Sequence, residues 1–159
     1  YLETDMFNAG FRPAINAGLS VSRVGGAAQT KAMKKAAGSI RIDLAQYREM
    51  EVFTQFSSDL DETTKAQLQY GKCLMELLKQ PLCNPLSMPQ QVITLVAATH
   101  KVLVDVEVSK LKAFQMDMLQ YFADMHKEII DELNDKKVLN DELTEKIVEV
   151  AEEFKKSRC

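Results

Sequence analysis

The 159-residue chain has no tryptophan and only three cysteines, four prolines and six glycines. The cysteines Cys73, Cys83 and Cys159 are too few and too unevenly spaced for a disulfide framework, and no CxxC pair offers metal-ligand spacing. We therefore expect reduced thiols. No apolar run approaches the roughly 18 residues that cross a bilayer, so the sequence predicts no membrane span. An apolar content of 46% excludes a disordered or low-complexity chain.

The 20 Lys and Arg residues are fewer than the 23 Asp and Glu residues, so the formal net charge is −3. This balance argues against a surface that binds polyanions, unless the charges are segregated. They are segregated, because residues 1–38 are basic overall and the last 36 residues are acidic overall. A DNA-binding helix-turn-helix would need a basic recognition helix, whereas the late helical segments are acidic. The sequence therefore predicts no nucleic-acid partner.

The amino-acid composition of the chain changes near residue 27. Residues 1–26 contain four of the six glycines and short apolar stretches, of which residues 14–24 are typical of a strand. From Ala27 onward, apolar residues recur at steps of three and four, which is the spacing of a helix face. We therefore expect a mainly α protein: a short strand and loop segment at 1–26, followed by a helical bundle at 27–159.

The expected helices follow from local signals. A first helix begins near Ala27 and is broken near Gly38. Residues 57–61 offer N-cap oxygens to a second helix, which the prolines of residues 80–85 stop. Pro89 suits the first turn of a third helix. A long amphipathic stripe from Val108 to Ile129 predicts a fourth helix, and Asn140 is the expected N-cap of the last one.

No catalytic or metal motif is complete. The run from Gly25 to Lys31 resembles a phosphate-binding loop, but its glycine spacing is wrong and Lys31 is followed by alanine rather than Ser or Thr. We expect a plain strand-to-helix turn there. His100 and His126 each lack a second ligand at metal spacing, so the sequence predicts no metal site.

Two arginines of the glycine-rich segment are the remaining candidates. Arg12 precedes Pro13, and Arg23 stands at the end of the expected strand, just before Gly25. Glycine lets backbone come close to a ligand, and a guanidinium is a rigid fork of donors that suits an oxyanion. The simpler alternative is a pair of surface arginines in a loop. For Arg23 the neighbouring residues favour a guanidinium that meets an oxyanion offered from outside the chain.

These same residues carry a resemblance to a known family. The run PAINAGLSVS at residues 13–22 matches a signature shared by alpha and beta subunits of F-type ATP synthases. The run RVGGAAQTKAMKK at residues 23–35 is similar to the alpha version. Further matches lie at residues 43–49 and 77–80. The chain therefore resembles the alpha subunits of F-type ATP synthases over some 80 residues, and the match beyond residue 85 is weaker.

The resemblance implies the carboxyl-terminal third of such a subunit. Residues 1–26 would be the edge of a nucleotide-binding domain whose P-loop lies upstream, and residues 27–159 the helical domain. Arg23 corresponds to an arginine that reaches across the alpha–beta interface to ATP bound by the beta subunit. Arg12, Pro13 and Gln80 correspond to part of the adenine pocket at alpha's own non-catalytic site. The family commonly has a second glutamine two residues after Gln80, where this chain has leucine.

The resemblance also implies cofactors, partners and location. The full complex would use ATP or ADP with Mg²⁺ and would couple ATP synthesis or hydrolysis to H⁺ transport. Its alpha subunit would contact beta subunits and the rotor gamma subunit, on the cytoplasmic face of a bacterial membrane or the matrix or stromal face of an organelle.

The start of the chain, at Tyr1 without Met or signal peptide, predicts a fragment. Because the chain has no P-loop, we expect it to hydrolyse no ATP alone and to hold no nucleotide tightly. The alternative function is a helical-bundle interaction module that takes no part in chemistry.

Overall fold

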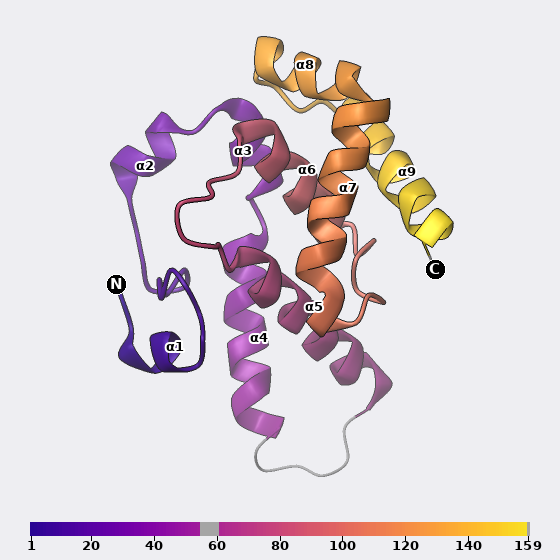
Figure 1. Cartoon of the computed structure of the whole chain (residues 1–159). Helices are drawn as coiled ribbons and strands as arrows, with labels where there is room; N and C mark the ends of the chain where they lie inside the picture. Colours follow the sequence, from indigo (N-terminus) through magenta and orange to yellow (C-terminus); the bar gives the residue numbers. More distant parts are fainter. Residues whose placement is uncertain (55–60, 159) are drawn as a thin grey trace.

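The computed structural model describes residues 1–54 and 61–158, and within these ranges it contains helices and no β-sheet (Figure 1). The mainly α prediction is therefore confirmed. The elements are α1 (Thr4–Asn8), α2 (Arg23–Ala28), α3 (Lys31–Ala36), α4 (Ile40–Thr54), α5 (Glu62–Leu78), α6 (Met88–Thr99), the 3-10 turn η1 (Val108–Lys110), α7 (Leu111–Met125), α8 (Lys127–Lys136) and α9 (Asp141–Arg158).

Helix α6 is the centre of the bundle. Its residues from Val92 to Ala98 are buried except Leu95, which is half-buried, and a helix that is apolar on nearly every side is stable only inside a core. It packs against α3, α5, α7, α8 and α9. The largest fully buried side chains around it include Leu74, Leu111, Phe122, Leu133 and Ile147. Helix α4 lies at the side of the bundle and packs mainly on α5.

Several predicted helix boundaries are confirmed. The first helical region is broken between α3 and α4, around Gly38. Pro89 lies in the first turn of α6, where Ser87 and Gln90 form a capping box. Asp61 caps α5 by accepting a hydrogen bond from the Thr64 amide at 3.0 Å. The other N-cap candidates of that prediction, residues 57–60, lie outside the described residues, as does Cys159.

The prediction of one continuous fourth helix is wrong. Helix α7 ends at Met125, and His126 has φ −134° and ψ 44°, so that α8 begins in a new direction at Lys127. The His126 ring lies 5.4 Å from the ring of Tyr121, measured between centroids, and is only partly exposed. The change of direction returns α8 to the bundle, where Ile129 and Leu133 are buried. Neither glycine nor proline marks this break in the sequence.

The strand expected within residues 14–24 is also wrong. The described chain has only an isolated antiparallel bridge between Leu2 and Ile15, and the later part of the segment forms α2. A strand requires a neighbour that completes its hydrogen bonds, and no other described segment lies alongside. Val21 and Val24 are 73% and 81% exposed, so the later part of the segment is not buried either.

Asn16 organises the amino-terminal segment. Its side chain is almost fully buried, its Nδ2 donates to Oε1 of Glu3 at 2.6 Å, and its Oδ1 accepts from the amides of Gly18 and Leu19. The backbone is held by further bonds from the Glu3 amide to the Ala14 carbonyl and from the Asn16 amide to the Tyr1 carbonyl. Because these bonds satisfy every polar atom of the Asn16 amide except one N–H, the loop that carries residues 12 and 13 is tied back on itself.

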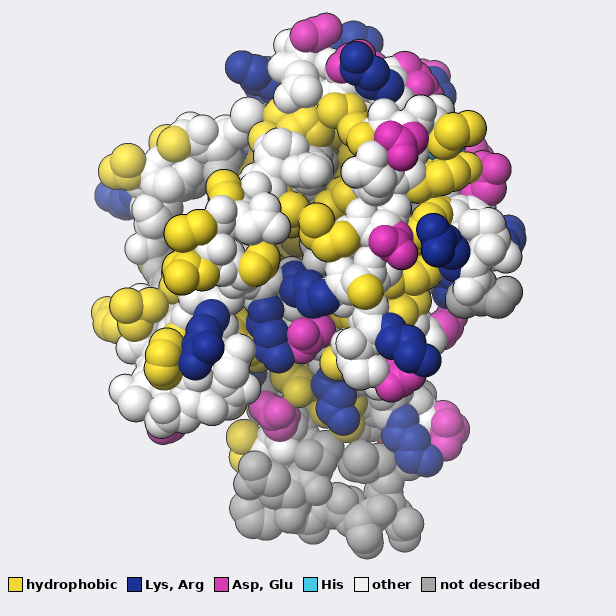
Figure 2. All heavy atoms as spheres, viewed as in Figure 1, with side chains coloured by type: hydrophobic (Ala, Val, Ile, Leu, Met, Phe, Trp, Pro, Cys, Tyr) yellow, Lys and Arg dark blue, Asp and Glu magenta, His cyan; other side chains and the backbone are white. Residues whose placement is uncertain are grey.

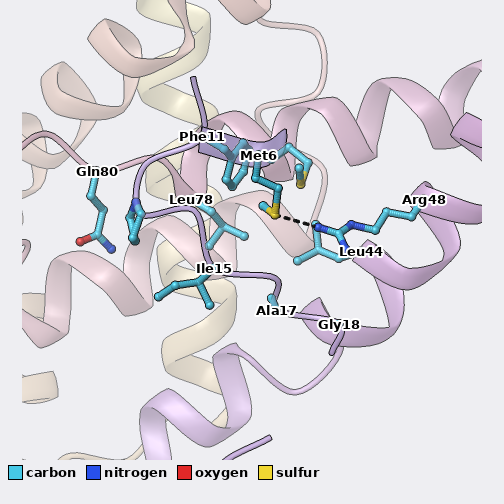
Figure 3. Close-up of a pocket in the computed structure, with 11 residues that line it drawn as sticks. Met6, Phe11, Ile15, Ala17, Gly18, Leu44, Arg48, Leu78 and Gln80 are labelled. Atoms are coloured by element: carbon cyan, nitrogen blue, oxygen red, sulfur yellow. Dashed lines mark hydrogen bonds between the residues drawn. The ribbon is translucent and has the colours of Figure 1, made fainter. Parts of the chain in front are cut away.

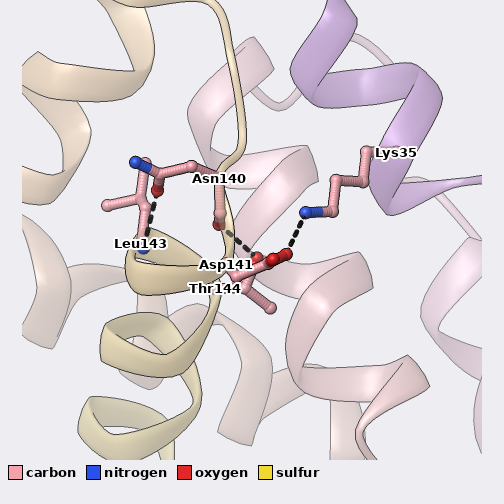
Figure 4. Close-up of polar contacts among 5 residues, drawn as sticks. All are labelled: Lys35, Asn140, Asp141, Leu143 and Thr144. Carbon is pink, nitrogen blue, oxygen red and sulfur yellow. Dashed lines mark hydrogen bonds and ion pairs between the residues drawn. The ribbon is translucent and has the colours of Figure 1, made fainter.

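Asn140 caps α9, as predicted. Its Oδ1 accepts a hydrogen bond from the Leu143 amide at 2.8 Å, and Thr144 Oγ1 donates to its carbonyl oxygen at 2.8 Å (Figure 4). The neighbouring Asp141 pairs with Lys35 of α3 at 2.6 Å, but both side chains are exposed and such pairs stabilise little.

We expect Asn140→Ala to lower the free energy of unfolding by about 1 kcal/mol, because an N-cap oxygen is lost. Asn140→Ser, which retains a capping oxygen, should restore most of that loss. Chemical denaturation of the two variants beside the parent chain measures the difference. An alanine variant as stable as the parent would show that the cap contributes nothing.

Candidate functional site

A groove of about 1060 Å³ runs between the amino-terminal segment, the linker after α5 and the start of α7. Its lining contains the three residues that the family resemblance groups into one pocket, Arg12, Pro13 and Gln80. The remaining lining residues are Phe7, Gly10, Lys79, Pro81, Leu82, Cys83, Asn84, Leu86, Lys112, Gln115 and Met116. The tertiary structure thus brings residues separated by nearly seventy positions to one surface.

The groove is basic although the chain is acidic. Its lining holds Arg12, Lys79 and Lys112 and includes neither Asp nor Glu. Figure 2 shows Lys and Arg side chains gathered in the middle of this face of the molecule. Lys79 is partly neutralised, since its Nζ lies 2.6 Å from Oε2 of Glu76. An anionic ligand with an apolar or aromatic part would fit this mixture of cations, amides and apolar walls.

The backbone joins the two halves of the predicted site. The Gln80 amide donates to the carbonyl oxygen of Arg12 at 2.8 Å. The Arg12–Pro13 peptide bond is cis, and the Arg12 guanidinium carbon lies 4.5 Å from the centre of the Phe7 ring. The side-chain amide of Gln80 is exposed and makes no hydrogen bond with other described residues. Its donor and acceptor groups are therefore available to a ligand in the groove.

Leu82 is the residue at which the resemblance predicts a second glutamine. Its side chain is 94% exposed and lines the groove. A leucine side chain offers neither donor nor acceptor, so Gln80 and Asn84 supply the side-chain amides of the linker in the groove lining.

A smaller pocket of about 200 Å³ shares Pro13 and Gln80 with the groove. Figure 3 shows that its walls come from the amino-terminal segment, α4 and α5. The lining is mostly apolar, and Nη2 of Arg48 donates to the sulfur of Met6 at 3.2 Å. The pocket is too small for a nucleotide, and we interpret it as the packing boundary between the amino-terminal segment and the bundle.

Arg23 lies apart from the groove. It is the first residue of α2, it is exposed, and it lines none of the four cavities characterised in this structure. The Ser22 hydroxyl accepts from the Gly25 amide at 2.9 Å, so Arg23 begins a capped helix instead of ending a buried strand, and the expected strand-to-helix turn is wrong. Figure 1 shows α2 standing away from the bundle. Within residues 1–54 and 61–158, its guanidinium has no hydrogen-bond or ion-pair partner.

Other chemistry-bearing groups lie elsewhere. A polar hollow of about 250 Å³ contains Tyr47 and Tyr70, and burial together with a hydrogen bond to Glu51 raises the pKa of Tyr47 to about 12. Burial raises the pKa of the Cys73 thiol to about 11, so this thiol stays protonated at neutral pH and is a poor nucleophile. Cys83 lines the groove and is exposed.

The described residues include neither a metal-binding cluster nor a membrane-spanning helix. They contain no group of three or more His, Cys, Asp or Glu side chains that could hold a metal ion. None of the helices in the described part of the chain combines the length and the apolar character that a bilayer crossing requires.

With the groove and the bundle defined, comparison with known proteins places the chain in a family. Residues 29–154 match the family model for the ATP synthase alpha/beta chain, C-terminal domain. Because that match covers most of the chain, the chain belongs to this family.

The curated relatives specify which branch of the family the chain resembles. It is 51% identical over 156 residues to the ATP synthase subunit alpha of Clostridium kluyveri strain ATCC 8527, and equally to that of strain NBRC 12016. Each match covers 98% of this chain and 31% of the relative. The chain thus spans about a third of the length of the curated relatives it matches, and the predicted resemblance to alpha subunits is confirmed.

Sequence reasoning missed Lys79 and Lys112 as groove residues. Lys79 is adjacent to Gln80 in the sequence, so it could have been predicted as a further groove residue at the end of α5. Lys112 lies more than thirty residues further on, in α7, and reaches the groove only because α7 packs against α5. No local pattern marks it, since a lysine near the start of a helix is ordinary.

Proposed function

We propose that the chain serves as the carboxyl-terminal part of an alpha subunit in an F-type ATP synthase. The observation that carries this proposal is 51% identity over 98% of the chain to proteins named ATP synthase subunit alpha. In this role the chain takes part in the head of a complex that couples ATP synthesis or hydrolysis to ion transport. Its partners are beta subunits and the rotor gamma subunit, and the complex is peripheral to the cytoplasmic face of a bacterial membrane or the corresponding face in an organelle.

Arg23 is proposed to act at a catalytic site that a neighbouring beta subunit supplies. Phosphoryl transfer spreads negative charge over the phosphate oxygens, and an arginine donated from another subunit stabilises that charge. The exposure of Arg23 and its lack of a partner among the described residues support the role, because a guanidinium committed to an internal ion pair would not be available. One arginine cannot replace a P-loop, so the chain alone should not turn over ATP.

The groove is proposed to form part of alpha's own nucleotide site. Gln80 presents a donor and an acceptor to a purine edge, and the Pro13 ring supplies an apolar wall. Arg12 adds a fixed positive charge suited to the anionic part of ATP or ADP. The Mg²⁺ that accompanies the nucleotide would be held by phosphate oxygens and by residues outside this groove, whose lining has no carboxylate.

A chimeric subunit tests the proposal. The Clostridium kluyveri alpha subunit, with its carboxyl-terminal 31% replaced by this chain, is expressed with that organism's other ATP synthase subunits. We expect a complex that assembles and hydrolyses ATP at a rate close to that of the unmodified complex, whereas the purified 159-residue chain hydrolyses none. A chimera that assembles without turnover would favour the interaction module. A chimera that fails to assemble, while its unmodified counterpart does, would contradict the proposal.

A further inference from the structure

A series of polar contacts leads from the centre of the bundle toward the groove. Nε2 of Gln115 in α7 donates to Oγ1 of Thr94 in α6 at 3.1 Å, and both side chains are buried, with exposed fractions of 1% and 4%. Oε1 of the same Gln115 accepts from Nζ of Lys112 at 3.0 Å. Buried polar groups are costly unless they are paired, so each member of this series restricts the orientation of the next.

Lys112 connects this series of polar contacts to the end of α5. Its Nζ donates to the carbonyl oxygen of Leu77 at 2.7 Å. Leu77 lies in the last turn of α5, where carbonyl groups lack partners within the helix and a positive charge is favourable. Lys112 is half-buried, and that burial lowers the pKa of its ammonium group, while Glu76 opposes the shift. The charged group of Lys112 therefore carries a desolvation cost that an apolar side chain at this position would not.

The end of α5 is also the approach to the predicted binding residue. Two residues separate Leu77 from Gln80, whose backbone amide donates to the Arg12 carbonyl oxygen at 2.8 Å. The linker that contains Gln80 is otherwise exposed through residue 85. The position of the Gln80 amide therefore depends on how firmly the last turn of α5 is held.

We propose that Lys112 is a positioning residue, which holds the end of α5 so that Gln80 stays bonded to Arg12 and faces the groove. Lys112 acts through the Leu77 carbonyl and does not itself need to touch a nucleotide. The proposal rests on the proposed function only where it concerns nucleotide affinity. The effect of Lys112 on the position of Gln80 depends only on contacts within this chain.

Three variants in the chimeric complex test the proposal. Lys112→Met keeps much of the side-chain length but removes every donor, whereas Lys112→Arg keeps charge and N–H groups. Lys110→Met is the matched control, because Lys110 lies two residues earlier, is exposed and pairs with Glu107. If Lys112→Met does not assemble, Lys112→Gln replaces it as a smaller change that still removes the charge.

The first measurement is hydrogen exchange of the Gln80 amide without nucleotide, with the α9 amides as reference. Lys112→Met should speed exchange at Gln80 by about tenfold, the size expected from the loss of one charged hydrogen bond. Lys112→Arg should recover most of the protection, and Lys110→Met should not change it. Equal exchange in all variants overturns the proposal, as does an equal acceleration in α9, which would indicate a general loss of stability.

The second measurement is the affinity of a fluorescent ATP analogue for alpha's own site. Lys112→Met should weaken it by about tenfold, and Lys112→Arg should restore the affinity. If Gln80 exchange shifts but the parent complex binds no analogue at that site, the proposed nucleotide role of the groove fails and the positioning role stands. If the parent binds and Lys112→Met binds equally well, the positioning role fails.

Discussion

Arg23→Lys in the chimeric complex is expected to lower ATP turnover by about a thousandfold or more. An arginine supplied in trans to a phosphoryl-transfer site is typically worth about 10³ to 10⁵ in rate, which corresponds to roughly 4 to 7 kcal/mol of transition-state stabilisation. Lysine keeps the positive charge but loses the planar fork that contacts two phosphate oxygens at once. Steady-state ATP hydrolysis at saturating ATP measures the effect.

The control for that experiment is Arg41→Lys. Arg41 is also exposed, and Nη2 of its guanidinium lies 3.5 Å from the Gly18 carbonyl oxygen, so the same chemical change is made at a position without a proposed role. We expect its turnover to stay within about twofold of the parent, the range typical of surface substitutions. Assembly of each variant is checked by gel filtration. Full turnover by an assembled Arg23→Lys complex would remove the proposed role of Arg23.

Gly71→Ala is expected to lower the free energy of unfolding by about 2 kcal/mol or more, and the sign is opposite to what the sequence alone would predict. A glycine inside a helix is less stable than alanine by about 1 kcal/mol, so α5 by itself should gain from the change. In the fold, a Cβ at residue 71 would lie 2.1 Å from Cδ2 of Tyr47. That ring is buried between α4 and α5, and forcing it aside typically costs 1 to 3 kcal/mol, occasionally more.

Two comparisons isolate the cause of the Gly71 effect. Gly26→Ala in α2, where a new Cβ meets nothing within 4 Å, should leave stability unchanged or slightly raised. Gly71→Ala in a Tyr47→Ala background should cost less than in the parent, because the clashing ring atoms Cγ and Cδ2 are absent. Urea denaturation of the parent chain and of the four variants gives the free energies. Equal costs in both backgrounds would show that the contact with the Tyr47 ring is not the reason.

Several helix ends were predictable because they depend on neighbours in the sequence. The Asn140 cap and the Pro89 first turn are local features, and each acts within one helical turn. The break at His126 was not predictable, because residues on both sides favour a helix. Continuing it straight would have carried Ile129 and Leu133 away from the core in which they are now buried. The expected strand failed for the related reason that a strand depends on a partner segment, which local pattern does not reveal.

Part of the candidate site was likewise predictable from the sequence, and part of it was revealed only by the structure. The resemblance picked out Arg12, Pro13 and Gln80, and the structure brings them to one groove, although the resemblance itself could not say what else lines it. Lys112 joins them because α7 packs on the end of α5.

The sequence by itself therefore determined the helical class, several helix ends and the family, since these depend on spacing and residue identity within short runs. Only the tertiary structure decided the direction of α8, the tight packing at Gly71 and the basic character of the groove. Each of these arises from contacts between segments that lie far apart in the chain, and such contacts depend on how side chains from separate helices fill a shared volume.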